Sequence, residues 1–232
     1  MRRALTGNWR DEHLFLLKQS LAIFDDLAKR VQECDAKIEA LLAPLQRHAL
    51  TLKASAKGKN NPNFDVRQAM ANWAGVDLTR IDGLGVSIVM KLLSEIGTDL
   101  GRFANVKHFC SWLGLCPGTK IRGGKVLSAG TKRSANRARQ ALKMTAMSLS
   151  RSDSALGAFY RRLSSRMDKP RANTAVAHKL ARMVYFMLTR GEEYVDQGRE
   201  RYEELQRQRS IAALKRRAAA LGFQVTPAGV TT

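Results

Sequence analysis

Acidic residues are scarce in one part of this 232-residue sequence. Residues 118–190 contain seventeen Lys and Arg but only two acidic residues, Asp153 and Asp168. The whole chain has 40 basic and 20 acidic residues, so this segment, less than a third of the length, carries +15 of the net charge of +20. Charge of one sign at this density repels itself, and a polyanion neutralises it most effectively. The pattern therefore predicts a surface that binds nucleic acid.

Cysteine, histidine and long apolar runs are also scarce. The three cysteines, Cys34, Cys110 and Cys116, show no CxxC spacing, and the four histidines are scattered. We therefore expect no zinc site, and a reducing compartment. No apolar run approaches the roughly 20 residues of a membrane helix, and the first thirteen residues lack the apolar core of a signal peptide. We expect a soluble intracellular protein that is not associated with a membrane.

A heptad pattern follows the N-terminus. Apolar residues recur every seven positions from Leu17 to Leu45, and a second row, three residues earlier, is interrupted by Asp35. This spacing predicts a long amphipathic helix over residues 11–52 with a coiled-coil seam, which Pro44 kinks or shortens. Two readings stay open: the helix packs on its own domain, or it pairs with a second helix or chain and makes a homo-oligomer.

The remaining sequence predicts helices separated by short breaks. Strand patterns are nearly absent, so we expect an all-α chain, with a coiled-coil-like helix in residues 1–58 and a helical domain in residues 59–232. Residues 114–130 are rich in glycine and predict an irregular loop or a small hairpin around Gly123 and Gly124. The predicted helices of this domain cover residues 66–73, 86–96, 106–115, 131–150, 153–166, 174–189 and 199–221.

Residues 81–91, with the sequence IDGLGVSIVMK, fit the turn of a helix-hairpin-helix within residues 66–97. Gly83 and Gly85 flank one apolar residue, which permits a tight turn and lets backbone N–H groups of the next helix approach a phosphate. Lys91 is a nearby cation. Such contacts position a nucleic-acid backbone without reading its sequence. The other reading is an ordinary helix–helix turn.

Several blocks of this sequence resemble one known family. They read IDGLGVSIVMKLLSEIG, GRFANVKHFCSWLGLCP, SANRARQALKMTA and YEELQRQRSIAALKRRAAALGF, in this order, with a glycine loop before the third. Together they resemble, over about residues 65–225, the C-terminal transposase domain of the insertion-sequence 110/116/902 family, in which a bridge RNA guides recombination. The long N-terminal helix looks like the coiled-coil spacer of that family.

Two departures from the family pattern matter for activity. Family members carry an N-terminal RuvC-like nuclease domain with four metal-binding acids, and no such cluster is present here. We therefore predict no metal site or cofactor in this chain, with divalent metal entering only through the missing domain.

The family nucleophile is a serine before glycine in the loop, and Arg122 stands at that position. A guanidinium cannot attack a phosphodiester, although it can clamp a phosphate. Ser128 is a candidate substitute nucleophile, and Ser134 is another nearby hydroxyl; loop hydrogen bonding or helix capping is the other reading for both.

Basic residues of the glycine loop and of the following helix are candidate phosphate contacts, because no acidic residue lies among them. They are Arg122, Lys125, Lys132, Arg133, Arg137, Arg139 and Lys143. A second cluster surrounds Pro170 and comprises Arg161, Arg162, Arg166, Lys169 and Arg171.

The resemblance implies a DNA-binding transposase or recombinase domain for insertion-sequence transposition, truncated and inactive alone, with DNA and a structured guide RNA as partners. It also implies a bacterial cytoplasmic protein that is associated with the nucleoid. One alternative is a non-catalytic nucleic-acid-binding accessory protein that uses its helix-hairpin-helix. A third reading is a coiled-coil scaffold whose basic faces are only solvated.

Overall fold

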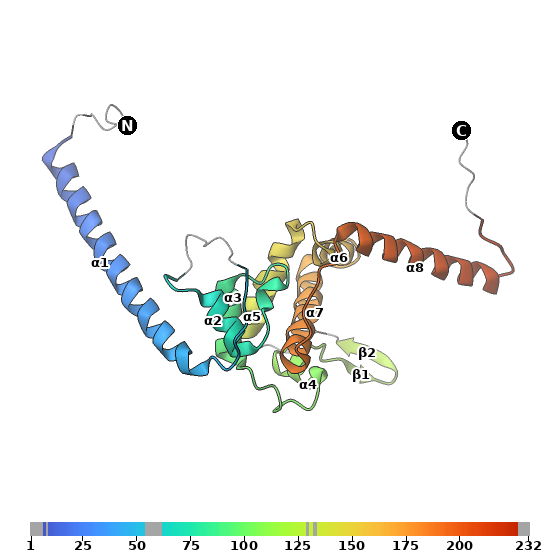
Figure 1. The fold of residues 1–232 in the computed structure, drawn as a ribbon. Coiled ribbons are helices and arrows are strands. Elements are labelled where there is room, and N and C mark those ends of the chain that lie inside the picture. Colours follow the sequence, from blue (N-terminus) through green and yellow to red (C-terminus); the bar gives the residue numbers. More distant parts are fainter. Residues whose placement is uncertain (1–6, 8, 54–61, 129, 132–133, 227–232) are drawn as a thin grey trace. The chain divides into compact units, whose positions relative to one another are not determined.

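The computed structural model describes residues 7, 9–53, 62–128, 130–131 and 134–226. These residues form a helical fold with one small hairpin (Figure 1), which confirms the predicted all-α class. The chain divides into two compact units, residues 1–73 and 74–232. The helices are α1 (Asp11–Leu42), α2 (Val66–Ala74), α3 (Val86–Ile96), α4 (Val106–Trp112), α5 (Arg137–Ser148), α6 (Ala155–Ser164), α7 (Lys169–Arg190) and α8 (Arg199–Ala220), and the strands are β1 (Lys120–Arg122) and β2 (Lys125–Ser128).

In the first unit, α1 ends ten residues before the predicted position. Pro44 follows Leu42 and lies in a short 3-10 helix, Ala43–Leu45. A proline ring excludes the helical hydrogen bond and clashes with the preceding turn, so the α-helix ends there. Asp11 and Glu12 occupy its first turn, where negative charge offsets the helix dipole.

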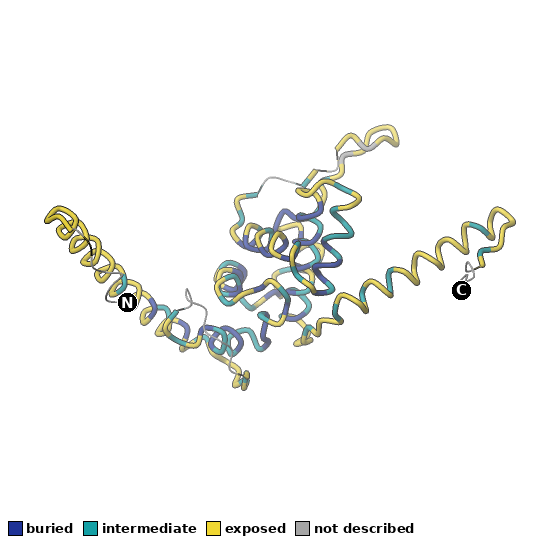
Figure 2. Tube along the Cα trace, turned by 90° about the horizontal axis from the view of Figure 1, so that it is seen from above, coloured by how far each residue is buried: buried dark blue, intermediate teal, exposed yellow. Residues whose placement is uncertain are grey.

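The first three positions of the heptad row of α1 are exposed. Leu17, Phe24 and Val31 are 64, 66 and 57% exposed, and Figure 2 shows almost the whole helix as exposed. Asp35, which interrupts the second row, is buried, and its carboxylate accepts the backbone N–H of Asn63 at 3.0 Å. The seam therefore stops where later residues of the same unit pack on α1.

In the second unit, α5 and α7 form the centre of a helical core. α3 packs on α5, α4 and α6 pack on α7, and α8 packs on α6. Figure 2 shows the buried positions concentrated on these core helices. The most deeply buried side chains include Leu93, Phe109, Leu113, Leu142, Leu149 and Leu180.

Most helix bounds in this unit lie within two residues of the predicted ones, although α4 ends three residues earlier than predicted. Capping residues explain the two largest differences. α3 has the predicted bounds. α5 begins six residues later than predicted, because the Asn136 side chain accepts the backbone N–H of Arg139 and caps the helix there. α7 begins five residues earlier than predicted, because Asp168 caps it and Pro170 fits its first turn.

The glycine loop folds as a hairpin that is joined to the helical core at its base. Gly123 and Gly124 form its turn with φ of 56° and 77°. Two successive positive φ values are typical of a type I′ turn, which suits the twist of paired strands. The strands pair Arg122 with Lys125 and Ile121 with Val126.

Candidate nucleic-acid interface

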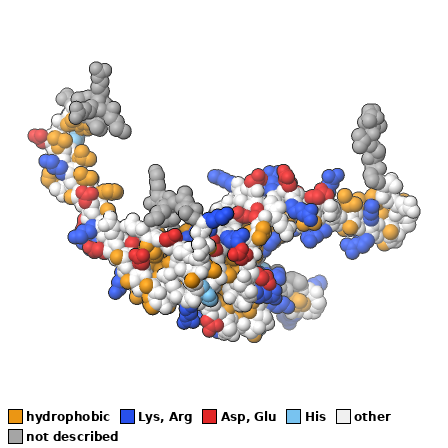
Figure 3. All heavy atoms as spheres, in the orientation of Figure 1, with side chains coloured by type: hydrophobic (Ala, Val, Ile, Leu, Met, Phe, Trp, Pro, Cys, Tyr) orange, Lys and Arg blue, Asp and Glu red, His pale blue; other side chains and the backbone are white. Residues whose placement is uncertain are grey.

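The segment that forms α4, the hairpin and α5 contains no acidic residue. Between Asp99 and Asp153 the sequence has eleven Lys or Arg and no Asp or Glu. Lys and Arg side chains gather over the end of the second unit that carries the hairpin, and along α8 (Figure 3). Because the segment supplies no local counter-charge, its exposed cations create a positive potential suited to phosphate groups.

The glycine turn packs against the C-terminal end of α5. Gly83 has φ of 82°, and a Cβ added there would lie 3.0 Å from Thr145 Cγ2 and 3.2 Å from Ser148 Oγ. Gly85 caps α3, and a Cβ added at Gly85 would have no atom within 4 Å, so the approach to the α3 N-terminus is open. The element before the turn is a three-residue 3-10 helix, Leu78–Arg80. The turn thus offers backbone N–H groups beside a close helix contact.

Two contacts show that α3 and α5 pack antiparallel. Gly83, before α3, lies against the end of α5, whereas Glu95, near the end of α3, is 3.4 Å from Arg137 at the start of α5. The hairpin joins the start of α5. The twelve residues of α5 span about 18 Å at 1.5 Å per residue. The structure therefore places the glycine turn and the hairpin at opposite ends of α5 and does not bring them together.

Two cations and two apolar residues of the hairpin face solvent. Arg122 and Lys125 are exposed and face each other across the strands. Ile121 and Leu127 are 64 and 66% exposed. A two-stranded ribbon of this size fits a nucleic-acid groove, and an opposed pair of cations can contact two phosphates.

Arg139 has a structural part in this region. Its Nη2 donates to Thr131 Oγ1 at 3.1 Å, and its Nη1 lies 3.5 Å from the carbonyl oxygen of Ser134. Thr131 also bridges to Pro117 at the base of the hairpin. Arg139 is half-buried and ties the base of the hairpin to α5.

The other predicted cations differ in exposure. Lys91 is exposed on α3, one helical turn before Glu95. The Arg137 side chain is 83% exposed, so its pairing with Glu95 is worth less than about 1 kcal/mol and leaves it accessible to another anion. Lys143 is half-buried on α5. Lys132 and Arg133 lie outside the described residues.

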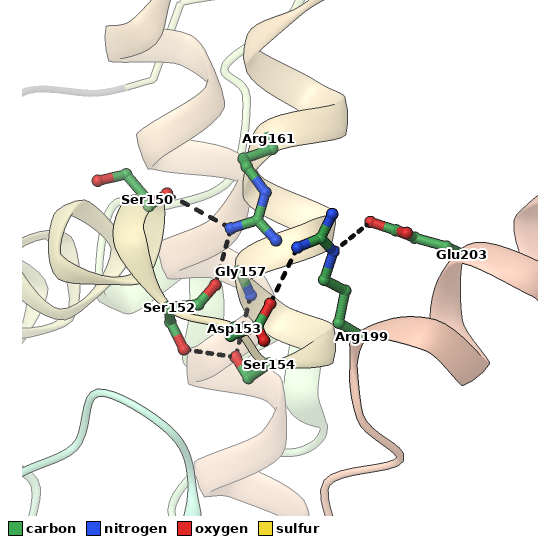
Figure 4. A network of polar contacts seen from close by, with 8 residues as sticks. All are labelled: Ser150, Ser152, Asp153, Ser154, Gly157, Arg161, Arg199 and Glu203. Carbon is green, nitrogen blue, oxygen red and sulfur yellow. Dashed lines mark hydrogen bonds and ion pairs between the residues drawn. The ribbon is translucent and has the colours of Figure 1, made fainter.

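The second basic cluster is partly used inside the fold. Arg161 donates to the carbonyl oxygen of Ser152 at 2.7 Å (Figure 4), and Arg162 donates to the Tyr202 hydroxyl at 3.0 Å. Arg171 lies 3.3 Å from Asp168. Arg166 and Lys169 are exposed. Two of the five arginines and lysines thus fix the loop before α6 and the base of α8.

Among the described residues, the hydrogen bonds of the two loop serines are to backbone N–H groups and not to a base. The Ser128 hydroxyl accepts the backbone N–H of Gly130 at 3.4 Å, and that of Ser134 accepts the N–H of Asn136 at 3.2 Å. An activated serine needs a base within hydrogen-bond reach. These contacts agree with local roles in a turn and before a helix.

The structure also exposes an aromatic residue that the sequence patterns above did not single out. Trp112, at the end of α4, is 41% exposed. The guanidinium carbon of Arg102 lies 5.1 Å from the centre of its ring. Helical spacing gave no clear signal for it, because Trp112 follows the buried Phe109 by three residues and the exposed His108 by four.

Cysteine and acidic groups give no sign of redox or metal chemistry in the part of the chain that the structure describes. Burial raises the pKa of the Cys110 thiol to about 12, so it stays protonated at neutral pH. Among these residues no three His, Cys, Asp or Glu side chains are grouped so as to hold a metal ion. No helix in the same ranges is long and apolar enough to cross a membrane.

Comparison with known proteins finds a similarity to one family within the second unit. Residues 77–161 match the model of the Transposase IS116/IS110/IS902 family. The match covers the glycine turn, α3, α4, the hairpin, α5 and most of α6, and it confirms the resemblance over this stretch. A search of curated proteins found no match.

Proposed function

Because residues 77–161 match the IS116/IS110/IS902 transposases, we propose that this chain is a DNA-binding part of an insertion-sequence transposition system. The observation that carries the proposal is the stretch without acids between Asp99 and Asp153, which forms the hairpin and α5. Its exposed cations would neutralise phosphates, and counterion release would supply most of the affinity.

The hairpin is the main phosphate contact in this proposal. Arg122 and Lys125 are opposed across the strands at its tip, and Gly123 and Gly124 between them carry no side chains that would hold a backbone away. The glycine turn at the far end of α5 is a second contact, made by N–H groups of α3. Both contacts position DNA and do not read its sequence.

The proposed role is binding without strand cleavage by these residues. Arg122 occupies the position of the family's serine, and a guanidinium has no hydroxyl to form a phosphodiester bond with DNA. The Ser128 hydroxyl is engaged with Gly130. Arg122 fits the role of a phosphate clamp, because its planar group donates two parallel hydrogen bonds.

We also propose that α1 pairs with α1 of a second copy. Its exposed row, Leu17, Phe24 and Val31, is spaced as in a coiled coil, and a single helix with such a row is marginal in water. The paired helices would hold two copies of the DNA-binding unit on one assembly.

The test of DNA binding is fluorescence anisotropy with a labelled duplex at low salt. We expect the double variant Arg122→Gln/Lys125→Gln to bind about tenfold more weakly or worse, because two phosphate contacts are lost. The control is Lys18→Gln/Lys29→Gln on α1, which removes the same charge from exposed positions of the other unit.

Equal losses in the two double variants would show that net charge alone drives binding and would remove the hairpin from the proposal. Absence of binding by the unaltered protein in dilute buffer would overturn the proposal as a whole.

The alternative is a nucleic-acid-binding accessory protein outside transposition, which Arg122 at the serine position also supports. The variant Arg122→Ser separates the two. In a transposase domain supplied with a RuvC-like nuclease half, it should form a covalent protein–DNA link; in an accessory protein, it forms none.

A further inference from the structure

The outward face of α4 carries polar and aromatic residues only. Lys107, His108, Ser111 and Trp112 are all exposed, whereas Phe109 on the other side of the helix is buried. The spacing i, i+1, i+4 and i+5 places the four exposed residues on one side of the helix. This face lies in the same acid-free stretch as the hairpin but was not among the predicted contacts.

The Trp112 ring is held in place from one side. It lies 6.3 Å from the Phe109 ring at an interplanar angle of 23°, and 5.4 Å from the Phe103 ring. Phe109 in turn contacts Tyr185 of α7 at 5.6 Å. An exposed aromatic ring with fixed orientation loses little conformational entropy when a ligand stacks on it.

Arg102 is fixed beside the same ring. Its guanidinium carbon lies 4.8 Å from the centre of the Phe103 ring and 5.1 Å from that of Trp112, and its Nη2 donates to the Ile96 carbonyl oxygen at 3.0 Å. Arg102 is nevertheless exposed. The surface therefore combines a flat aromatic ring with two accessible cations, Arg102 and Lys107.

We infer that Trp112 stacks on an unpaired nucleobase while Arg102 and Lys107 contact the phosphates beside it. Stacking on aromatic rings with cations along the backbone is how proteins hold single strands. The bases of an intact duplex already stack on each other, so a paired base cannot reach the ring. Charge favours this ligand over a basic peptide, because no acid in this stretch would attract such a peptide and the cations suit phosphates.

This inference rests on the proposed nucleic-acid function and names the form of nucleic acid bound. Its test uses the full chain with Trp9→Phe and Trp73→Phe, so that Trp112 is the one fluorescent tryptophan. The ligands are a single-stranded DNA, a single-stranded RNA, a blunt duplex and a duplex with a single-stranded tail. Anisotropy of a labelled ligand measures binding, and Trp112 emission measures stacking.

We expect Trp112 emission to be quenched by both single strands and by the tailed duplex, and to stay unchanged with the blunt duplex. Comparison of the DNA and RNA strands shows which one the surface prefers. In the same assay Trp112→Ala should weaken single-strand binding about tenfold, with less than about a twofold effect on the blunt duplex, since one stacked base is lost. Trp112→Phe should retain most of the affinity.

Four results would overturn the inference. Binding of single strands without quenching, or equal quenching by the blunt duplex, removes the stacking site and leaves the proposed DNA binding intact. Quenching by an acidic helical peptide but not by single strands assigns the surface to a protein partner. Absence of binding to every nucleic acid removes the proposed function and this inference together. The quenching experiment tests the stacking site even if the substitution Trp112→Ala lowers the stability of the protein.

Discussion

At the residue scale, the excess of arginine divides into side chains that hold the fold and side chains that face solvent. Arg139, Arg161 and Arg162 direct their guanidinium groups to carbonyl or hydroxyl oxygens of the same unit. Arg122 and Arg137 are exposed. The count of basic residues therefore exceeds the number available for phosphate contacts, and only the exposed group should affect binding without affecting stability.

Gly157, in the first turn of α6, is a position that tolerates no side chain. A Cβ there would lie 2.1 Å from the Ser152 carbonyl oxygen and 3.0 Å from that of Leu149, both backbone atoms. We expect Gly157→Ala to destabilise the protein by about 1–3 kcal/mol, because the loop before α6 must move. Chemical unfolding measures this change. Gly130→Ala is the control, since its nearest neighbour would lie 3.9 Å away; an equal loss in both variants would contradict the prediction.

Ionisation of the Asp82 carboxyl group, in the glycine turn, is unfavourable in the folded protein. Burial first, and then the negative charge of Asp196, raise the pKa of its carboxyl group, although a hydrogen bond with Ser154 lowers it. Its Oδ2 is buried with no hydrogen-bond partner among the described residues. Because the folded pKa exceeds the unfolded value, this group stabilises the fold at low pH, and that contribution is lost as pH rises through the folded pKa.

We therefore expect Asp82→Asn to raise the midpoint of thermal unfolding at neutral pH, since the amide carries no charge to desolvate. The gain should shrink as pH falls through the raised pKa of the Asp82 carboxyl group in the folded protein, because the parent side chain then becomes neutral as well. Asp99→Asn, at an exposed position that accepts the Gly101 N–H, is the control and should change little. A gain that is independent of pH would argue against desolvation as the cause.

At the scale of elements, helix positions could be predicted from the sequence, while helix ends depended on side-chain hydrogen bonds. α3 lies between two glycines and has the predicted bounds. The predicted start of α5 was six residues too early. Basic and alanine residues favour a helix across residues 131–136, but the cap at Asn136 outweighs that preference. The β strands are short, and their pairing follows from the two glycines of the turn.

The exposed row of α1 should determine self-association. We expect Phe24→Glu to lower the oligomer mass in sedimentation experiments, because a charge at the centre of an apolar seam is costly to bury. Gln19→Glu introduces the same charge on the opposite face of α1 and is the control. The unfolding of residues 74–232 should stay unchanged in both. An unaltered mass in the Phe24 variant would rule out this seam as the contact.

At the scale of the whole molecule, the net charge of +20 makes any phosphate binding strongly dependent on salt. Affinity for duplex DNA should fall linearly with the logarithm of salt concentration, with a slope of about 0.9 per phosphate contacted. In the variant Arg122→Gln/Lys125→Gln the slope should decrease by the amount that corresponds to about two phosphate contacts. Anisotropy titrations at several salt concentrations measure it, and an unchanged slope would show that the hairpin touches no phosphate.

The sequence could predict which segment forms the candidate interface, but not which side chains of that segment face solvent. The lack of acids between Asp99 and Asp153 is visible in the sequence, and so are the hairpin glycines. The inward direction of Arg139 and the exposure of Trp112 depend on Thr131 and on the rings of Phe103 and Phe109, and such tertiary contacts leave no periodic signal. The separation of the glycine turn from the hairpin likewise follows from helix packing.

The length of α5 sets a minimum size for a ligand that reaches both ends. Its span of about 18 Å equals roughly five nucleotide steps of about 3.4 Å along one strand of a duplex. In a series of oligonucleotides of increasing length, affinity should rise sharply once this distance is bridged and only gradually afterwards. α5 would then act as a molecular ruler, and inserting one helical turn into it should shift that threshold by one to two nucleotides.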